Sequence, residues 1–291
     1  MFRGSKTMKK TYSFNDLQGK VVVITGGSGV IGDAITSGLA AVGCRVVVLD
    51  LFQDKAEASA QKLNTEYGID AIGLAANVLD KASLIAAKAQ INQQFGKIDI
   101  LINCAGGNHP KATTQLEQIL PENLNELEKG FFGLELEGFR SVFDLNFMGT
   151  LLPTLVLATD MIEQQKGVIL NISSMNAFRP LTKIPAYSAA KAAINNFTEW
   201  LSTHFARMNI RVNAIAPGFF LTNQNRFLLI DEKTGEFTPR GQKVMNGTPM
   251  GRFGEPEELC GTVLYLLSDI SAFVTGVVIP VDGGFNSFSG V

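Results

Sequence analysis

The chain alternates short, β-branched hydrophobic runs with longer segments of helical period. Runs at residues 21–24, 46–49, 98–102, 168–172 and 212–215 have the composition of strands buried on both faces, and weaker strands are expected at 71–75 and 276–279. Amphipathic or alanine-rich segments at 30–42, 55–67, 81–95, 138–164 and 187–207 predict helices between them. This alternation predicts a doubly wound α/β fold, with a mostly parallel, seven-stranded sheet and helices on both faces.

Domain organisation follows from the same pattern. No linker, low-complexity tract or short repeat interrupts it, so we expect one domain over residues 15–291 after a flexible segment at 1–14. Two excursions, 107–137 and 218–254, depart from the alternation. Both follow strands of a parallel sheet and should emerge at its carboxyl edge, where ligands bind. We therefore expect the excursions to line a binding site or to act as lids.

Composition narrows the classes of function. The 291 residues are 46% hydrophobic and carry a formal net charge of −2, which gives no general attraction for nucleic acid or an anionic membrane. We find no secretory signal, and no apolar run approaches the ~20 residues that span a bilayer. We therefore expect a soluble, cytoplasmic protein that binds a small-molecule substrate.

The cysteines and histidines predict neither disulfides nor a metal site. Cys44, Cys104 and Cys260 are widely spaced among apolar residues, as free thiols in a reducing compartment are. His109 and His204 are too few and too distant in sequence to complete a metal-ligand cluster with them.

The turn between the first strand and first helix predicts a dinucleotide site. Its glycines, Gly26, Gly29 and Gly32, allow a tight turn and close approach of a pyrophosphate to the helix N-terminus. Asp50 ends the second strand, where a carboxylate binds the adenosine ribose, although it could instead cap a helix. Because a carboxylate repels a 2′-phosphate, NAD is preferred over NADP. Other positions expected to border the cofactor are Ser28, Val30, Ile31, Leu51, Asn77, Val78, Asn103, Ala105 and Gly106.

A second group of residues predicts proton transfer. Tyr187 and Lys191 stand one helical turn apart, and Ser174 lies thirteen residues upstream of Tyr187. Side chains at i and i+4 share a helix face, so the ammonium can lie beneath the phenol and lower its pKa from ~10. Such a pair suits proton exchange with an alcohol oxygen. The same spacing also occurs on ordinary helices, as a half-buried ring beside an exposed cation.

Together these motifs resemble those of the short-chain dehydrogenase/reductase family over residues 19–285. The resemblance implies a Rossmann-type fold, an NAD(P)-dependent oxidoreductase acting on CH–OH groups, and a homotetramer built across helices 138–164 and 187–207. Val30 departs from the family pattern, since shorter members usually carry glycine there, and Asn77 replaces a common aspartate. The remaining shared motifs are Asn103-Cys-Ala-Gly106, Asn146, Asn171-Ile-Ser-Ser174, Asn213-Ala-Ile-Ala-Pro-Gly218 and Val281-Asp-Gly-Gly284.

The resemblance also implies a role for each catalytic residue. Tyr187 would give a proton to the carbonyl oxygen in reduction and remove it in oxidation. Ser174, with Ser173 as its rival, would hold that oxygen. Lys191 would lower the pKa of Tyr187 and bind the nicotinamide ribose, and Asn146 would hold a water that relays protons.

Near the nicotinamide, the resemblance implies a contact from Thr222 to the carboxamide. Thr222 could equally cap a helix. Pro217 and Gly218 would shape the pocket wall, and Phe220 would border the cofactor.

The segment from Gly106 to Thr114 resembles that of the D-mannonate oxidoreductases (fructuronate reductases) within this family. It implies interconversion of D-mannonate and D-fructuronate. A uronate needs a cation and several polar partners. Lys111 and Arg179 could supply the cation, although each could also be a solvated loop charge. Other polyol, sugar or 3-oxoacyl reductases stay open because phenylalanines could form an apolar rim, and a non-catalytic NAD-binding module is a remote alternative. Candidate substrate residues are His109, Lys111, Ser174, Asn176 and Arg179.

Overall fold

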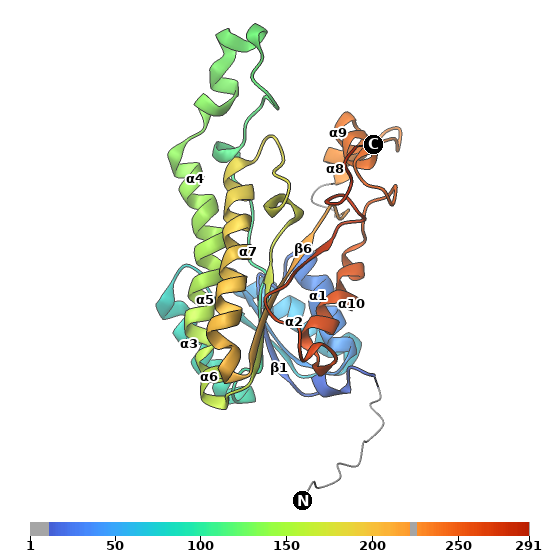
Figure 1. The fold of residues 1–291 in the computed structure, drawn as a ribbon. Helices are drawn as coiled ribbons and strands as arrows, with labels where there is room; N and C mark the ends of the chain where they lie inside the picture. The colour runs from blue at the N-terminus through green and yellow to red at the C-terminus, as the bar shows by residue number, and fades with distance from the viewer. Residues whose placement is uncertain (1–11, 222–225, 291) are drawn as a thin grey trace, which may run out of the picture.

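Seven strands form one sheet at the centre of the protein, in the order β3-β2-β1-β4-β5-β6-β7 (Figure 1). The structure, a computed structural model, describes residues 12–221 and 226–290, so most of the predicted segment 1–14 lies outside the described residues. All strand pairs are parallel, as expected. The strands are β1 (Val21–Thr25), β2 (Arg45–Asp50), β3 (Ala71–Ala75), β4 (Ile100–Asn103), β5 (Gly167–Ile172), β6 (Ile210–Pro217) and β7 (Val278–Val281).

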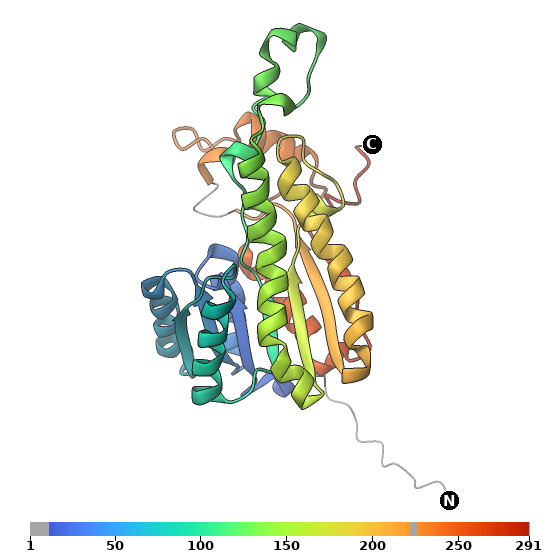
Figure 2. The same ribbon diagram turned by 90° about the vertical axis from the view of Figure 1, so that its left-hand side faces the viewer.

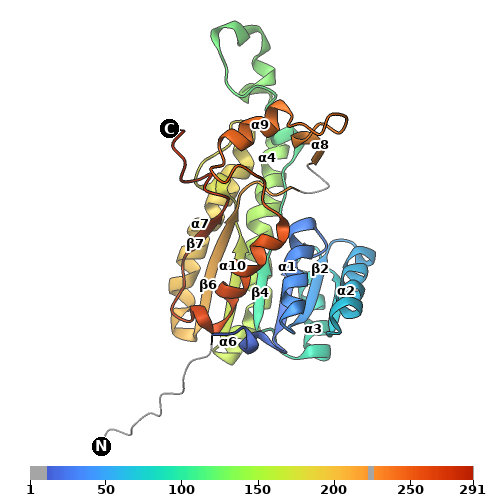
Figure 3. The same ribbon diagram turned by 90° about the vertical axis from the view of Figure 1, so that its right-hand side faces the viewer.

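Helices cover both faces of the sheet, which confirms the doubly wound fold. One face carries α1, α2 and α10 (Figure 3), and the other carries α3, the α4 to α6 segment and α7. The strand order reverses between β1 and β4, and ligands bind at such a switch point outside the carboxyl ends of the strands. The helices are α1 (Val30–Ala41), α2 (Gln53–Tyr67), α3 (Lys81–Phe95), α4 (Leu136–Phe143), α5 (Gly149–Leu157), α6 (Thr159–Gln164), α7 (Pro185–Phe205), α8 (Arg226–Leu229), α9 (Pro239–Asn246) and α10 (Leu259–Leu267).

Strands β1 and β4 are apolar up to their last residue because both of their faces are covered. In β1 all five residues are buried. Val22 and Ile24 pack in the core on the α1 side, whereas Val21 and Val23 pack in the core on the α3 side. The sheet therefore has two cores, and the site-bearing loops extend from strands that are rigidly held.

The helix predicted at 138–164 is interrupted in the structure. A π-helical segment, Asp144–Met148, joins α4 to α5, and Ala158 separates α5 from α6. The helical stretch Pro121–Gln164 is the one segment among the described residues that could cross a bilayer by length and hydropathy, but half of its apolar window is buried inside the fold. The part of this stretch from α4 to α6 packs against α7 and the sheet, so we assign that part to the core.

The first excursion does not form a lid over the sheet edge. Residues 107–113 stay near the edge, but residues 114–135, here called the arm, project beyond the end of α4 (Figure 2). The base of the arm is fixed by a hydrogen bond from the backbone N–H of Thr114 to the Lys183 carbonyl and by a Glu117–Lys243 ion pair. Its exposed apolar side chains are Ile119, Leu120, Leu124, Phe131 and Phe132.

The second excursion is folded rather than irregular. It contains α8 and α9, which share a small core formed by Leu229, Val244, Met245 and Phe253. A bridge between Phe220 and Gly254 closes its base beside β6. Its position at the carboxyl edge agrees with the expected site-lining role.

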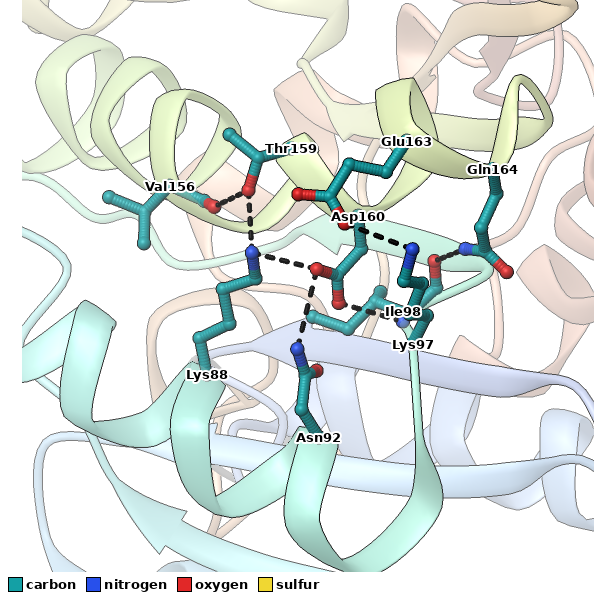
Figure 4. Close-up of polar contacts among 9 residues, drawn as sticks. All are labelled: Lys88, Asn92, Lys97, Ile98, Val156, Thr159, Asp160, Glu163 and Gln164. Atoms are coloured by element: carbon teal, nitrogen blue, oxygen red, sulfur yellow. Dashed lines mark hydrogen bonds and ion pairs between the residues drawn. The ribbon is translucent and has the colours of Figure 1, made fainter.

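At the opposite end of the sheet, a buried carboxylate ties three elements together (Figure 4). Asp160 is 1% exposed, forms an ion pair with Lys88 at 2.7 Å and accepts hydrogen bonds from Asn92 Nδ2 and the Ile98 N–H. These contacts join α6 to α3 and to the segment before β4. A buried charge requires such complete pairing because its desolvation is unfavourable.

We predict that Asp160→Asn lowers the free energy of unfolding by roughly 2 kcal/mol, because one amide oxygen cannot satisfy both Lys88 and the Ile98 N–H. Urea denaturation measures the change. The matched control is Glu163→Gln, which removes the exposed Lys97–Glu163 ion pair in the same view and should cost less than about 1 kcal/mol. Equal effects of the two substitutions would contradict the structural role of Asp160.

Candidate active site

The turn after β1 forms a cradle that only small residues allow. Gly26 has φ +63°, and a Cβ there would lie 2.9 Å from Ala105 Cα. A Cβ on Gly32 would lie 2.4 Å from the Gly26 carbonyl oxygen. Helix α1 starts at Val30 without a side-chain cap, so its first N–H groups remain available to an anion. The cradle fits a pyrophosphate, as the sequence predicts.

Asp50 lies beside this cradle, at the end of β2. Its carboxylate accepts hydrogen bonds from Ser28 Oγ in the glycine turn and from the Phe52 N–H. These two bonds hold the carboxylate at the carboxyl end of β2, and its oxygens can still accept further hydrogen bonds. This placement fits a contact with ribose hydroxyls.

The end of β4 is drawn against β1. Thr25 Oγ1 accepts hydrogen bonds from the N–H groups of Cys104 and Ala105, which fixes the start of the segment 104–106. A Cβ on Gly106 would lie 2.7 Å from Asn146 Oδ1 and 3.2 Å from Lys191 Nζ. The backbone at Gly106 thus lies against both side chains with no room for a Cβ, which explains the need for glycine there.

Ser174 and Tyr187 meet at the carboxyl end of β5. Tyr187 lies in the first turn of α7, which begins at Pro185, and Ser174 lies close enough to its hydroxyl to lower the pKa of the phenol. The rival Ser173 bonds instead to Asn195 Oδ1. Ser174 rather than Ser173 therefore faces Tyr187, and its role at a carbonyl oxygen stays a prediction.

Lys191 lies one turn after Tyr187 and is 3% exposed. Its Nζ donates a hydrogen bond of 2.7 Å to the Ile172 carbonyl and lies 5.5 Å from the centre of the Tyr187 ring. Among residues 12–221 and 226–290 no carboxylate pairs with it. Burial lowers the pKa of Lys191 to about 8.

The expected lowering of the Tyr187 pKa by Lys191 is not observed. Burial raises the pKa of Tyr187 to about 12, although the side chain as a whole is only half-buried, and the hydrogen bond with Ser174 offsets part of this rise. Desolvation is the largest influence on this pKa, and the Lys191 charge is not among its causes. In this cofactor-free form Tyr187 is a protonated phenol at neutral pH, as a proton donor to a ketone must be.

Asn146 occupies the centre of the π-helical segment and is fully buried. Its Nδ2 donates to the carbonyls of Gly107 and Val142, and its Oδ1 accepts from the Gly107 N–H. Single-turn π segments are frequent at functional sites. The widened turn lets one amide hold both its own helix and the segment after β4.

A buried polar ladder below the site was missed by the sequence analysis. Thr150 Oγ1 donates to the Asn146 carbonyl, and Thr154 Oγ1 donates to the Thr150 carbonyl. Asn103 Nδ2 then bonds to Thr154 Oγ1 and to Asn171 Oδ1. The Asn103 side chain thus points into the helix layer, and a cofactor contact from it would use its backbone. The four-residue spacing of Asn146, Thr150 and Thr154 in an otherwise apolar segment could have indicated this ladder.

The other predicted cofactor positions lie around the same edge. Asn77 is exposed and uses its Oδ1 on the Leu79 N–H, while Val78 is buried and Leu51 is exposed. Pro217 and Gly218 end β6, and a Cβ on Gly218 would lie 2.6 Å from Asp282 Cα. The Phe220 ring packs on Gly254. Thr222 lies outside the described residues.

The predicted substrate residues divide into two groups. Lys111 forms ion pairs with Glu135 and Glu137 at the base of the arm, so its charge is already matched. His109 Nδ1 accepts from the Lys111 N–H and caps a short 3-10 turn. Arg179 is exposed, and only its Nη1 is used, on the Phe288 carbonyl. Asn176 is buried directly after Ser174.

Comparison with known proteins agrees with this geometry. Residues 20–233 match the sequence model of the short chain dehydrogenases. The chain belongs to this family. An uncharacterized oxidoreductase of Bacillus subtilis, UxuB, is 50% identical over 95% of this chain and 98% of that protein. The 3-oxoacyl-[acyl-carrier-protein] reductase FabG of Aquifex aeolicus is 35% identical over 92% of this chain and 98% of that protein.

A crystal structure from Haemophilus influenzae shows the same fold at the same level of identity. That protein, provisionally named D-mannonate oxidoreductase and solved with bound NAD, is 50% identical and superimposes with a TM-score of 0.90, over 95% of this chain and 98% of that one. As a short-chain dehydrogenase, this chain is an NAD(P)-dependent oxidoreductase acting on CH–OH groups. The glycine cradle, the uncapped α1 terminus and the gap at Gly106 fit such a dinucleotide.

The chain's own residues supply the proton chemistry of this reaction. A bound nicotinamide gives or accepts the hydride. In that reaction Ser174 and Tyr187 would hold the carbonyl oxygen, and Tyr187 would donate a proton to it during reduction. Lys191, cationic below about pH 8, would place a positive charge 5.5 Å from the centre of the Tyr187 ring, facing the phenolate that forms when Tyr187 gives up its proton.

We predict that Tyr187→Phe lowers kcat by about 10³-fold, because the variant keeps the ring but loses the proton. NADH binding, followed by protein-to-nicotinamide energy transfer, should stay within a factor of about two, since the hydroxyl contributes little to ground-state binding. Retention of most of the turnover would remove Tyr187 from its role.

We predict that Lys191→Met stabilises the cofactor-free protein at pH 7 by roughly 2 kcal/mol while abolishing activity, because an unpaired buried ammonium opposes folding. The folded pKa, about 8, lies below the value of 10.5 in the unfolded chain, so the penalty is complete below pH 8. The gain should therefore shrink as the pH rises from 8 to 10.5.

Denaturant unfolding at several pH values measures this gain. The control, Lys166→Met, replaces an exposed lysine and should change stability by less than about 0.5 kcal/mol at every pH. A destabilised Lys191→Met protein at pH 7 would show that the ammonium is compensated in the fold.

Proposed function

We propose that this short-chain dehydrogenase interconverts the secondary alcohol and ketone of a sugar acid, D-mannonate and D-fructuronate, using NAD. The observation that carries the proposal is the complete set of Ser174, Tyr187, Lys191 and Asn146 at the switch point of the sheet. The name of the half-identical Haemophilus influenzae protein supports the substrate. In reduction, hydride reaches the ketone carbon and the Tyr187 proton reaches its oxygen.

A cation must hold the carboxylate of such a substrate. Of the two cations predicted from sequence, Lys111 is matched by two glutamates, whereas Arg179 keeps most of its five donors free. Arg179 follows Ser174 by five residues and lies in the same loop at the carboxyl edge. We therefore assign the carboxylate to Arg179, which can bind it through two parallel hydrogen bonds.

The preference for NAD over NADP is part of the proposal. Asp50 stands where a 2′-phosphate would have to lie, and its nearest partners are Ser28 and the Phe52 N–H rather than a cation. A second negative charge at this place is unfavourable. The NAD bound in the Haemophilus influenzae relative supports the same choice.

A 3-oxoacyl thioester reductase is the second candidate, because the Aquifex aeolicus relative has that activity in its name and exposed apolar side chains stand near the site. These are Phe178, 41% exposed in the loop after Ser174, and Met250, 68% exposed beside the C-terminal segment. This candidate does not explain an arginine with free donors at the site mouth.

We predict that D-fructuronate is reduced by NADH with a higher kcat/KM than D-fructose or a 3-oxoacyl thioester, and that Arg179→Leu raises the KM for D-fructuronate by about tenfold to hundredfold. The KM for uncharged D-fructose should not change in this variant, because D-fructose has no carboxylate for Arg179 to bind. NADH absorbance measures both rates.

Lys111→Leu is the matched control and should leave both KM values within about twofold, since its charge is already paired. Preferred turnover of the thioester would overturn the sugar-acid proposal. An equal rise in KM for the acid and for D-fructose in Arg179→Leu would remove Arg179 from carboxylate binding.

A further inference from the structure

The amide of Asn176 is buried but incompletely bonded. Asn176 is 6% exposed, and its Oδ1 is shielded from solvent without any hydrogen-bond partner. The large majority of buried side-chain polar atoms in proteins have a partner, so an orphaned acceptor requires an explanation. A ligand that donates a hydrogen bond is one such explanation.

Three other buried atoms among the described residues lack partners, but none has the same setting. Ser59 lies in α2 and Asn92 in α3, both away from the carboxyl edge. Asn103 is fixed by the two hydrogen bonds of its Nδ2, so the position of its Oδ1 follows from the polar ladder. Asn176 alone stands next to the catalytic serine.

The local backbone brings Asn176 close to the reacting carbonyl. Residues Met175–Ala177 form a single 3-10 turn directly after Ser174, and this turn packs against α7, the helix of Tyr187. The Asn176 N–H donates to Ser174 Oγ at 3.2 Å. The side chain of Asn176 therefore starts within one residue of the group that holds the carbonyl oxygen.

The chemistry of an amide limits what can satisfy it. A primary amide carries one acceptor and one donating nitrogen, and a hydroxyl group can answer either of them. A methylene group can answer neither. The ketone of D-fructuronate has a hydroxyl-bearing carbon on each side, whereas the ketone of a 3-oxoacyl thioester has a methylene on each side.

We propose that Asn176 binds a hydroxyl group on a carbon next to the reacting carbonyl and makes the enzyme selective for α-hydroxy ketones. The proposal rests on the proposed function and deepens it. A substrate without that hydroxyl leaves the amide oxygen buried and unpaired. Sites built to bind a hydroxyl reject analogues that lack it far more strongly than apolar pockets reject a surplus group.

The test compares D-fructuronate with its 1-deoxy and 3-deoxy analogues. We expect the wild-type enzyme to prefer D-fructuronate over at least one analogue by about 100-fold in kcat/KM. In Asn176→Leu, a variant of similar size, this preference should fall below about fivefold, mainly through slower turnover of D-fructuronate. Asn176→Ala, which cannot overpack the site, should show the same loss.

Asn92→Leu is the control away from the site, since it removes another orphaned amide oxygen, although it also removes the Asn92 hydrogen bond to Asp160 and should lower stability. It should keep the full preference for D-fructuronate. The thermal midpoint of cofactor-free Asn176→Leu provides a readout independent of activity and should equal or exceed that of the wild type, because an apolar side chain replaces an unpaired polar one.

Each outcome separates the two proposals. If the wild type discriminates between the hydroxy ketone and its deoxy analogues and Asn176→Leu discriminates equally well, the role of Asn176 is overturned while the proposed function stands. If the wild type prefers 3-oxoacyl thioesters, both proposals fall. If another hydroxy ketone is a better substrate than D-fructuronate, the proposed substrate is wrong. The Asn176 variants are then assayed with that ketone and its deoxy analogue.

Discussion

The site depends on one unusual constraint, the burial of the Lys191 ammonium without a carboxylate partner in the described part of the chain. Its hydrogen bond to the Ile172 carbonyl places the charge at the carboxyl end of β5, and burial lowers its pKa only to about 8. The group therefore stays cationic at neutral pH. A Cβ on Gly106 would lie 3.2 Å from Nζ, so glycine at this position keeps the ammonium uncrowded.

The π-helical segment has a physical reason in the same neighbourhood. A regular helix would rotate the side chain of Asn146 and break its contacts with Gly107. Instead, the widened turn is followed by Thr150 and Thr154, whose hydroxyls bond back along the helix and reach Asn103 in β4. The helix irregularity and the sheet edge are thus held in register by one polar ladder.

Elements with local signals could be predicted from sequence, and elements that depend on distant contacts could not. The seven strands and the glycine cradle follow from hydrophobic period and spacing, whereas the Ser174, Tyr187 and Lys191 set follows from the resemblance to a known family. The π-helical turn at Asp144–Met148 adds one residue to a helical turn and leaves the apolar pattern almost unchanged, so the hydrophobic period could not predict it. The ion pair between Lys111 and Glu135 could not be predicted without knowing where the arm returns to α4. The raised pKa of Tyr187 could not be predicted without knowing that its hydroxyl is buried.

Lys191 and Asn176 illustrate the same relation between folding and function. Each is a buried polar group whose bonding within the described chain is incomplete, and each stands at the end of β5. Such groups persist only where the surrounding elements are stable enough to hold them. Strand β5 meets this condition, because it is paired on both sides by β4 and β6 and is buried along most of its length. These two incompletely bonded groups therefore lie beside a strand that is held rigidly enough to tolerate them.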